Sequence, residues 1–399
     1  MKRASRAVAL TAAQARRIWL RAQRLDEPAP FGAGPAATRA AVEHLGYVQI
    51  DTIHVVERCH HQILYTRIPG YRREHLHRAQ ALDKSVFEYW THALAYVPTR
   101  DLRFFRRAMA SGWRRHSGWF GAVAATDMRK VLTRIRRDGA LSIRDIDDDV
   151  LVDKEHEWAS RKPSKRALQA AFFQGRLVVS ERRGMLKTYE LAERHFGWQK
   201  PPRAASAREI SAYLLDRALR AQGIVSLDSI CHLDAPGKPG VRRAIERRVR
   251  AGELVAVSFE GAAGTEYWAT PQALEDAAPR DPARVHILSP FDPLVIQRRR
   301  LARFFGYEHR FEAYVPKAKR QFGYFAQPVL VGDQIVAAID LKTDRVQGRL
   351  QVQQWTWIGR QPRRRLTPPI EEALHRFERF QLAGVPGSRS FAHPREAPD

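Results

Sequence analysis

The clearest alternation of polar and apolar positions along the chain lies in Gly46–Ile53, GYVQIDTI. β-branched and aromatic residues dominate this stretch, which predicts a β-strand. Successive strand side chains point to opposite faces, so Gln49 and Asp51 are expected side by side on an outward face. Val48 and Ile50 then face a core. The pattern predicts an amide and a carboxylate displayed together on a rigid platform.

An internal repeat predicts the architecture. The pattern R-x-x-G-x-x-S-x-x-x-I starts at Arg136 and again at Arg220, each time after an amphipathic helical stretch, Met128–Arg137 or Glu209–Gln222. Its glycine suits the left-handed residue after a helix, and its serine suits the N-cap of a short following helix. These residues are Gly139 and Ser142 in the first copy, and Gly223 and Ser226 in the second.

Each copy continues with a hairpin pattern, whose turns lie at Arg183-Gly184 and at Gly261–Gly264. Helix, short helix, helix and hairpin form the winged-helix plan. The N-terminal segment fits this plan with helices and two wing strands. The expected bounds are Thr11–Gln23 and Thr38–Leu45 for the helices, and Gly46–Ile53 and Gln62–Arg67 for the strands, which places Gln49 and Asp51 on a wing.

Short strands replace this plan after about Asp281, with a tight turn at Gly332-Asp333. The expected strands are Arg310–Val315, Gly323–Leu330, Gln334–Lys342 and Leu350–Ile358, followed by a helix over Ile370–Leu382. The predicted fold class is therefore α+β, with three tandem winged-helix units before a small β-barrel-like domain. The expected domain boundaries are 1–125, 126–200, 201–280 and 281–399, with a linker at 201–206.

Charge narrows the function classes. The chain of 399 residues has 68 Lys+Arg against 43 Asp+Glu, a net charge of +25 spread along its length. This favours a nucleic acid partner, although a generally basic proteome is the alternative. Two cysteines exclude a disulfide framework and a cysteine metal site. No apolar run fits a signal peptide or a membrane span, so we expect a cytoplasmic, nucleoid-associated protein, or a nuclear one in a eukaryote, without a membrane partner.

Four motifs, in order, carry a resemblance that runs from about Leu10 to Phe380. They are Gln49–Ile53 (QIDTI), Glu88–His92 (EYWTH), Leu288–Pro293 (LSPFDP) and Pro316–Phe325 (PKAKRQFGYF). The arrangement resembles the YcaQ/AlkZ family of winged-helix DNA glycosylases, which excise alkylated bases and unhook interstrand crosslinks. The Gln-x-Asp form of the first motif resembles the YcaQ branch of that family.

The resemblance implies that Asp51 and Gln49 are catalytic. Hydrolysis of an N-glycosidic bond passes through an oxocarbenium-like sugar, which a nearby anion stabilises. An N7-alkylated purine already carries positive charge and leaves as a neutral base, so no general acid is needed. Asp51 would stabilise the cation and activate water, while Gln49 positions the water or the sugar. Surrounding Arg and Lys are expected to keep Asp51 ionised. The alternative is an ordinary polar face of an edge strand.

Other residues have two interpretations each. Glu88, Trp90 and His92 form either a second shell behind the catalytic strand or a core cluster. The basic residues Lys317, Lys319, Arg320, Arg182 and Arg183 are expected to contact DNA, or to be solvated loop residues. Asp292 is expected to form a turn. The histidines lack ligand spacing, so we expect no metal.

The sequence thus predicts a monofunctional DNA glycosylase that acts as a monomer, without a cofactor, on double-stranded DNA with alkylated bases or crosslinks. The alternative is a non-enzymatic winged-helix DNA-binding protein such as a transcription regulator. Such regulators commonly dimerise on half-sites, whereas this chain carries three predicted units itself. An acid on the wing would also cost a regulator phosphate affinity.

Overall fold

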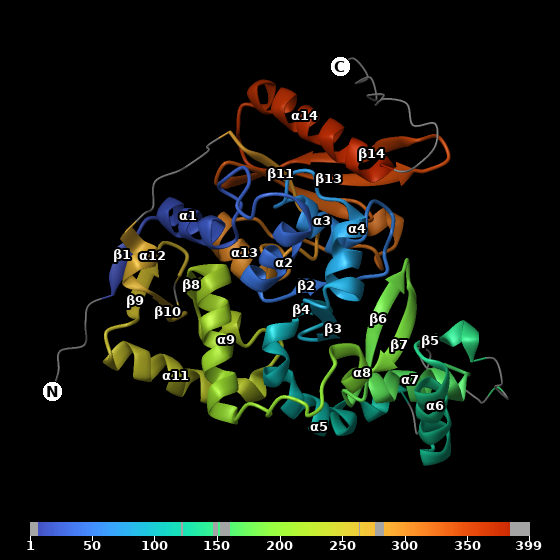
Figure 1. The fold of residues 1–399 in the computed structure, drawn as a ribbon. Coiled ribbons are helices and arrows are strands. Elements are labelled where there is room, and N and C mark those ends of the chain that lie inside the picture. Colours follow the sequence, from blue (N-terminus) through green and yellow to red (C-terminus); the bar gives the residue numbers. More distant parts are fainter. Residues whose placement is uncertain are drawn as a thin grey trace. The chain divides into compact units, whose positions relative to one another are not determined.

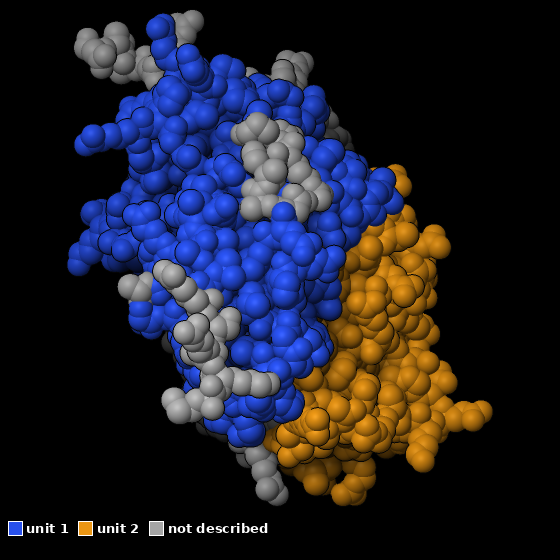
Figure 2. Space-filling model, turned by 90° about the vertical axis from the view of Figure 1, so that its left-hand side faces the viewer, with its two compact units in different colours: residues 1–33, 48–71, 214–399 blue, residues 34–47, 72–213 orange. Residues whose placement is uncertain are grey.

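The computed structural model describes residues 7–120, 123–146, 151, 160–262, 264–275 and 283–383. The chain divides into two compact units, which are coloured separately in Figure 2. Unit 1 comprises residues 1–33, 48–71 and 214–399, and unit 2 comprises residues 34–47 and 72–213. The described helices include none that is both long enough and apolar enough to cross a membrane.

Unit 1 contains a mixed sheet of order β1-β9-β10-β8. β1 (Val8–Leu10) runs parallel to β9 (Val255–Phe259), and β10 (Tyr267–Ala269) is antiparallel to both β9 and β8 (Ile224–Val225). Helix α1 (Ala12–Ala22) starts in a capping box made by Thr11 and buries Trp19. Trp19 packs edge-on against Phe304 of α13 (Arg298–Phe305), with 4.9 Å between ring centroids.

A second sheet of unit 1 has the order β11-β12-β13-β14 and is antiparallel throughout. Its strands are β11 (Val285–Ile287), β12 (Ala326–Val331), β13 (Gln334–Asp344) and β14 (Arg349–Trp357). Gly332, at φ 56°, forms the expected tight turn between β12 and β13. Helix α14 (Arg363–Leu382) contacts β11 and β14 (Figure 1).

This second sheet corrects the expected barrel. Among the described residues, the end strands β11 and β14 do not pair with each other, so the sheet is open. The segment 310–315 forms no strand; it bends into a turn in which Val315 N–H donates to the Glu312 carbonyl at 3.0 Å. The turn keeps this segment out of the sheet.

Helix α3 (Cys59–Tyr65) corrects the expected return strand at Gln62–Arg67. Cys59, Gln62 and Ile63 are all buried, and their i, i+3, i+4 spacing is that of one helix face. This periodicity was visible in the sequence. Because the return strand is a helix, no wing hairpin forms there, and Gln49 and Asp51 do not lie on a wing.

Unit 2 contains helices around two short antiparallel structures. β3 (Val86–Trp90) and β4 (Leu94–Pro98) form a hairpin, and β5 (Leu141–Ser142), β7 (Leu186–Leu191) and β6 (Leu177–Arg183) form a sheet in that order. Its helices are α2 (Gly34–Leu45), α4 (Arg73–His77), α5 (Leu102–Phe120), α6 (Ala125–Asp138), α7 (Pro163–Phe173) and α8 (Ala192–Phe196). Its core joins residues of the β3–β4 hairpin with residues of α5, α6, α7 and β6.

The two repeat copies show the predicted order of elements. The first runs from α6 through a 3₁₀ turn and α7 to the β6–β7 hairpin. The second runs from α9 (Ala207–Gln222) through α10 (Leu227–Ile230) and α11 (Lys238–Arg250) to β9 and β10, before α12 (Pro271–Glu275). Ser142 and Ser226 are N-caps, and Gly139 and Gly223 have φ 91° and 67°. That the chain holds three winged-helix units stays a prediction.

Candidate active site

Asp51 lies in an irregular segment of unit 1, not in a strand. β2 covers only Val48–Gln49, and the chain then leaves regular structure until α3. Asp51 is partly buried and its Oδ1 accepts a hydrogen bond from Ile53 N–H at 2.7 Å. Gln49 is only 6% exposed. The expected outward face that displays both side chains is therefore wrong.

Arg345 and Thr343 hold the segment that follows Asp51. The Arg345 guanidinium donates to the backbone carbonyl of His54 at 3.1 Å and also to that of Val56. Thr343 N–H, in β13, donates to the Val55 carbonyl at 2.9 Å. Three consecutive carbonyls are thus bound, and the backbone next to Asp51 has a defined course. Nothing local in the sequence identifies Arg345 as their partner.

Cys59 holds the other side of the segment. Its buried thiol donates to the backbone carbonyl of Gln49 at 3.0 Å. Burial raises the pKa of Cys59 well above its ordinary value, and the charge of Asp51 adds to this. The thiol therefore stays protonated and acts as a hydrogen-bond donor from the first turn of α3.

The pKa of Asp51 is raised above its ordinary value, and burial is the main cause. Hydrogen bonds from the backbone N–H groups of Ile53 and Thr52 partly oppose this rise. Among the described residues, no Arg or Lys forms an ion pair with Asp51. The expectation that basic neighbours hold this carboxylate ionised is therefore wrong in direction. A carboxylate with a raised pKa is a stronger proton acceptor than an ordinary aspartate.

The basic loop at 316–325, also in unit 1, presents two of its three predicted DNA contacts to solvent. Lys317 and Lys319 are exposed on a 3₁₀ turn. Arg320 is half-buried; its Nε donates to the Val315 carbonyl at 2.8 Å, and its guanidinium lies 5.0 Å from the Tyr324 ring centroid. Arg320 therefore helps to shape the loop.

Two buried carboxylates, which the sequence analysis did not single out, hold this loop. Glu312 accepts hydrogen bonds from the backbone N–H groups of residues 321 and 322 at distances of 2.7 to 3.0 Å. Asp340, in β13, accepts from those of residues 324 and 325 at 2.8 and 3.0 Å. Between them Gly323 has φ 114°, and a Cβ there would lie 2.3 Å from Asp340 Oδ2. Only glycine suits this position.

Glu88 and Arg182 form a buried ion pair in unit 2. Arg182 donates to the two carboxylate oxygens at 2.8 and 2.5 Å, and Gln80 Nε2 donates at 3.1 Å. Burial alone raises the pKa of Glu88, but the charge and hydrogen bonds of Arg182 outweigh it and lower the pKa. The Arg182 side chain is 4% exposed, so its guanidinium serves Glu88 instead of facing a DNA surface. Arg183 is 81% exposed and pairs with Glu181.

Trp90 and His92 make ring contacts at the end of β3. Trp90 lies 6.1 Å from Phe173, and His92 packs edge-on against Tyr47 at 5.1 Å between centroids. With Glu88 they belong to unit 2, whereas Asp51 belongs to unit 1. Their role as a second shell stays a prediction. Within the described part of the chain, no three His, Cys, Asp or Glu side chains form a group suited to a metal ion.

Two comparisons with known proteins agree with the predicted family. The structure is similar to that of the Streptomyces sahachiroi DNA glycosylase AlkZ, with a TM-score of 0.61 and 18% sequence identity over 95% of this chain and 98% of that one. A family model described as DNA glycosylase AlkZ-like matches residues 42–380. The match favours an enzyme over a transcription regulator. The chain belongs to the AlkZ-like family of DNA glycosylases, enzymes that hydrolyse N-glycosyl bonds in DNA.

Proposed function

We propose that this glycosylase excises N7-alkylated purines from double-stranded DNA and unhooks N7-linked interstrand crosslinks, with Asp51 as its reacting carboxylate. The observation that carries the proposal is the state of Asp51. It is a partly buried acid with a raised pKa, on a backbone segment held by Arg345 and Thr343. A chain with net charge +25 gains no phosphate affinity from such a group.

The chemistry needs one carboxylate. The bond between C1′ of the sugar and the purine nitrogen breaks, and its electron pair neutralises the cationic base, which leaves without protonation. Ionised Asp51 stabilises the oxocarbenium-like sugar. A water oxygen then bonds to C1′, and Asp51 accepts the proton that this water releases. The raised pKa of Asp51 suits this proton transfer. Because no lysine is invoked, the enzyme is monofunctional in this proposal.

Gln49 takes a positioning role in this proposal. Its backbone carbonyl is bound by the Cys59 thiol, and its side chain is buried. We assign its amide to hold the water or the sugar from the buried side of the segment. This differs from the sequence-based picture, in which the amide acts from an exposed strand face next to Asp51.

Exposed basic residues support a DNA substrate. Lys317 and Lys319 lie exposed in the loop at 316–325, and Arg183 lies at the tip of the β6–β7 hairpin. Contacts of this kind bind phosphates without regard to sequence. The charge of the damaged base then determines which lesions are excised, because only a cationic base leaves as a neutral molecule without protonation. We therefore expect little excision of uracil or 8-oxoguanine.

The test is single-turnover excision of N7-methylguanine from a duplex, with alkali cleavage of the product strand. Asp51→Asn should lower the rate by roughly 10²- to 10³-fold, the usual loss for one group that stabilises transition-state charge. DNA affinity should be equal or slightly higher, because a repelling charge is removed. Asp83→Asn, at an exposed carboxylate of unit 2, is the control with the same change in charge.

Two outcomes would refute the proposal. An Asp51→Asn rate above about a tenth of the wild-type rate would mean that the carboxylate supplies less than about 1.4 kcal/mol to the transition state. Uracil excision at a rate comparable to that of N7-methylguanine would show that the protein, and not the alkylation, activates the leaving group.

A further inference from the structure

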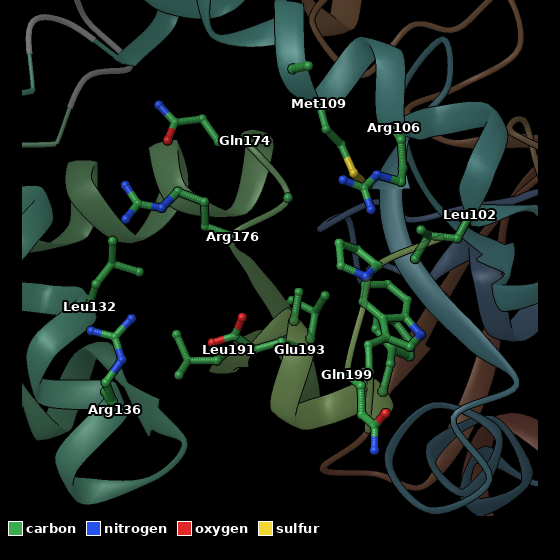
Figure 3. A pocket seen from close by; sticks show the side chains of 17 residues that line it. Leu102, Arg106, Met109, Leu132, Arg136, Gln174, Arg176, Leu191, Glu193 and Gln199 are labelled. Atoms are coloured by element: carbon green, nitrogen blue, oxygen red, sulfur yellow. The ribbon is translucent and has the colours of Figure 1, made fainter. Parts of the chain in front are cut away.

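Unit 2 contains a pocket of about 350 Å³ that the proposed chemistry of Asp51 does not use (Figure 3). Its walls come from α5, the end of α6, the turn between α7 and β6, and the start of α8. The volume lies within the range of pockets that hold small ligands. The lining combines charged groups that are mostly cationic with a wall of apolar and aromatic groups.

The charged groups of the pocket are mostly cationic. Arg106, Arg136 and Arg176 line it, against Glu193 as the one carboxylate among its lining residues. Arg136 and Arg176 are exposed, and neither forms an ion pair with a described carboxylate. Arg106 is oriented by a hydrogen bond from its Nη1 to the Pro202 carbonyl at 3.0 Å. The pocket therefore offers a surplus of guanidinium groups, which bind phosphate well.

Nearby acids have other partners, which explains this surplus. Asp138, at the end of α6, pairs with Arg137 at 2.5 Å. Glu190 pairs with Arg194 at 2.6 Å, and the same guanidinium caps the C-terminus of α6 by donating to the Ile135 and Arg136 carbonyls. Apart from Glu193, which lines the pocket itself, these neighbouring carboxylates are thus committed to other arginines.

The rest of the lining is apolar and aromatic. Leu132, Leu191 and Met109 contribute aliphatic surface. Phe196 and Trp198 stack on each other, with ring centroids 4.6 Å apart and planes at 21°. The amides of Gln174 and Gln199 complete the wall (Figure 3). An inorganic phosphate would use only the guanidinium groups and leave this surface empty. A flat apolar group with an edge that forms hydrogen bonds would use it.

We propose that this pocket binds a nucleoside phosphate, with the base against the apolar wall and the phosphate among the arginines. Aromatic surface beside cationic side chains is the combination by which proteins hold unpaired nucleotides. The nucleotide is either a free mononucleotide or an unpaired residue at a DNA end. This binding goes beyond the proposed excision reaction and does not depend on Asp51.

Calorimetric titration of the full chain tests the proposal. The probes are deoxyguanosine 5′-monophosphate, deoxyguanosine and inorganic phosphate, each alone. The mononucleotide should bind at least about tenfold more tightly than either part. A duplex with a one-nucleotide overhang is then compared with its blunt counterpart. Preference for the overhang identifies a DNA end as the source, whereas equal affinity for both duplexes identifies the free mononucleotide.

Three variants separate pocket binding from general attraction. Arg136→Gln combined with Arg176→Gln removes the two exposed guanidinium groups and should weaken mononucleotide binding by about tenfold or more. Ala110→Trp keeps every arginine but fills the pocket from its exposed rim, and it should weaken binding similarly. Arg129→Gln, at an exposed position of the same helix as Arg136 but outside the lining, is the control and should bind as the wild type does.

The proposal is overturned if inorganic phosphate binds as tightly as the mononucleotide, because the apolar wall then contributes nothing. It is also overturned if Ala110→Trp binds normally, or if the Arg129→Gln control loses as much affinity as the double variant. Excision of N7-methylguanine by the same proteins is measured separately. A loss of nucleotide binding with normal excision supports the pocket and leaves the Asp51 chemistry untouched.

Discussion

A buried ion pair in unit 1 allows a quantitative prediction about the free energy of unfolding. Arg67 and Asp292 side chains are both 0% exposed and meet in a bidentate arrangement at 2.7 and 3.0 Å. Asp292 also accepts from Leu294 N–H at 2.9 Å, which agrees with the turn-forming role expected from its motif. Arg67 bonds the carbonyl and the side chain of Gln23 as well. Asp292 therefore joins the segment just after α3 to the C-terminal part of the unit.

Asp292→Asn keeps the shape of this site but leaves the Arg67 charge without its counter-ion. Removal of one partner from a fully buried pair costs about 3–5 kcal/mol. Because the pair is bidentate and completely buried, we expect Asp292→Asn to lower the free energy of unfolding by about 4 kcal/mol. Arg67→Met should cost a similar amount. The double variant Arg67→Met with Asp292→Asn should cost much less than the sum, because no unpaired charge remains.

Urea unfolding of the four proteins measures the free energy of unfolding for this cycle. Arg39→Met is the control, because its pair with Glu43 is on an exposed helix face and should contribute below about 1 kcal/mol. A cost below about 1 kcal/mol for Asp292→Asn, or simple additivity of the two single changes, would refute the reasoning. If Asp292→Asn instead loses excision with its stability intact, Asp292 acts in catalysis and the anchoring role fails.

Three further predictions concern the active segment, the basic loop and DNA binding. Excision needs ionised Asp51, and burial raises the pKa of this carboxyl group, so the single-turnover rate should fall as pH decreases, with an apparent pKa above the ordinary aspartate value. An apparent pKa at or below the ordinary value would contradict the burial of Asp51. The pKa of Asp51 is higher in the folded state than in the unfolded state, so the wild type loses stability as pH rises through the folded-state pKa. Asp51→Asn should therefore be more stable than the wild type near neutral pH, and the difference should vanish in acid. Urea unfolding at a series of pH values measures this difference. Gly323→Ala should cost roughly 1–3 kcal/mol, because φ 114° is strained for alanine and its Cβ would clash with Asp340; an unchanged urea midpoint would show that the loop adapts. Binding to undamaged duplex should be weak, independent of sequence and steeply salt-dependent in fluorescence anisotropy, whereas a strong preference for one undamaged sequence would revive the regulator alternative.

The repeat elements were predictable because their signals are local. Gly139, Gly223, Ser142 and Ser226 each act within a few residues of a helix end, through a positive φ or a side-chain cap. The spacing between them then fixes the order of helices and hairpin. The same kind of local signal located the turn at Gly332, where two residues join strands of alternating pattern.

The long-range contacts of the site were not predictable in this way. Arg182 and Glu88 are 94 residues apart in the chain, and Arg345 bonds the carbonyl of His54 across 291 residues. A single sequence carries no local mark of such a partner. The basic residue Arg182 therefore looked like a DNA contact, because an arginine near the tip of a hairpin resembles a wing residue whether its guanidinium is exposed or buried.

The direction of the Asp51 pKa shift shows why the net charge of the chain did not predict the pKa of one carboxylate. The net charge of +25 acts on a DNA molecule across the whole surface, but salt screens it over about 8–10 Å. The pKa of one carboxylate depends on its immediate surroundings, and there burial prevails while no described cation pairs with it. The two effects serve different steps in the proposed reaction. Distributed arginines and lysines bring the polyanion to the protein. Asp51, which pairs with no cation of the described residues, keeps its negative charge available to the developing positive sugar.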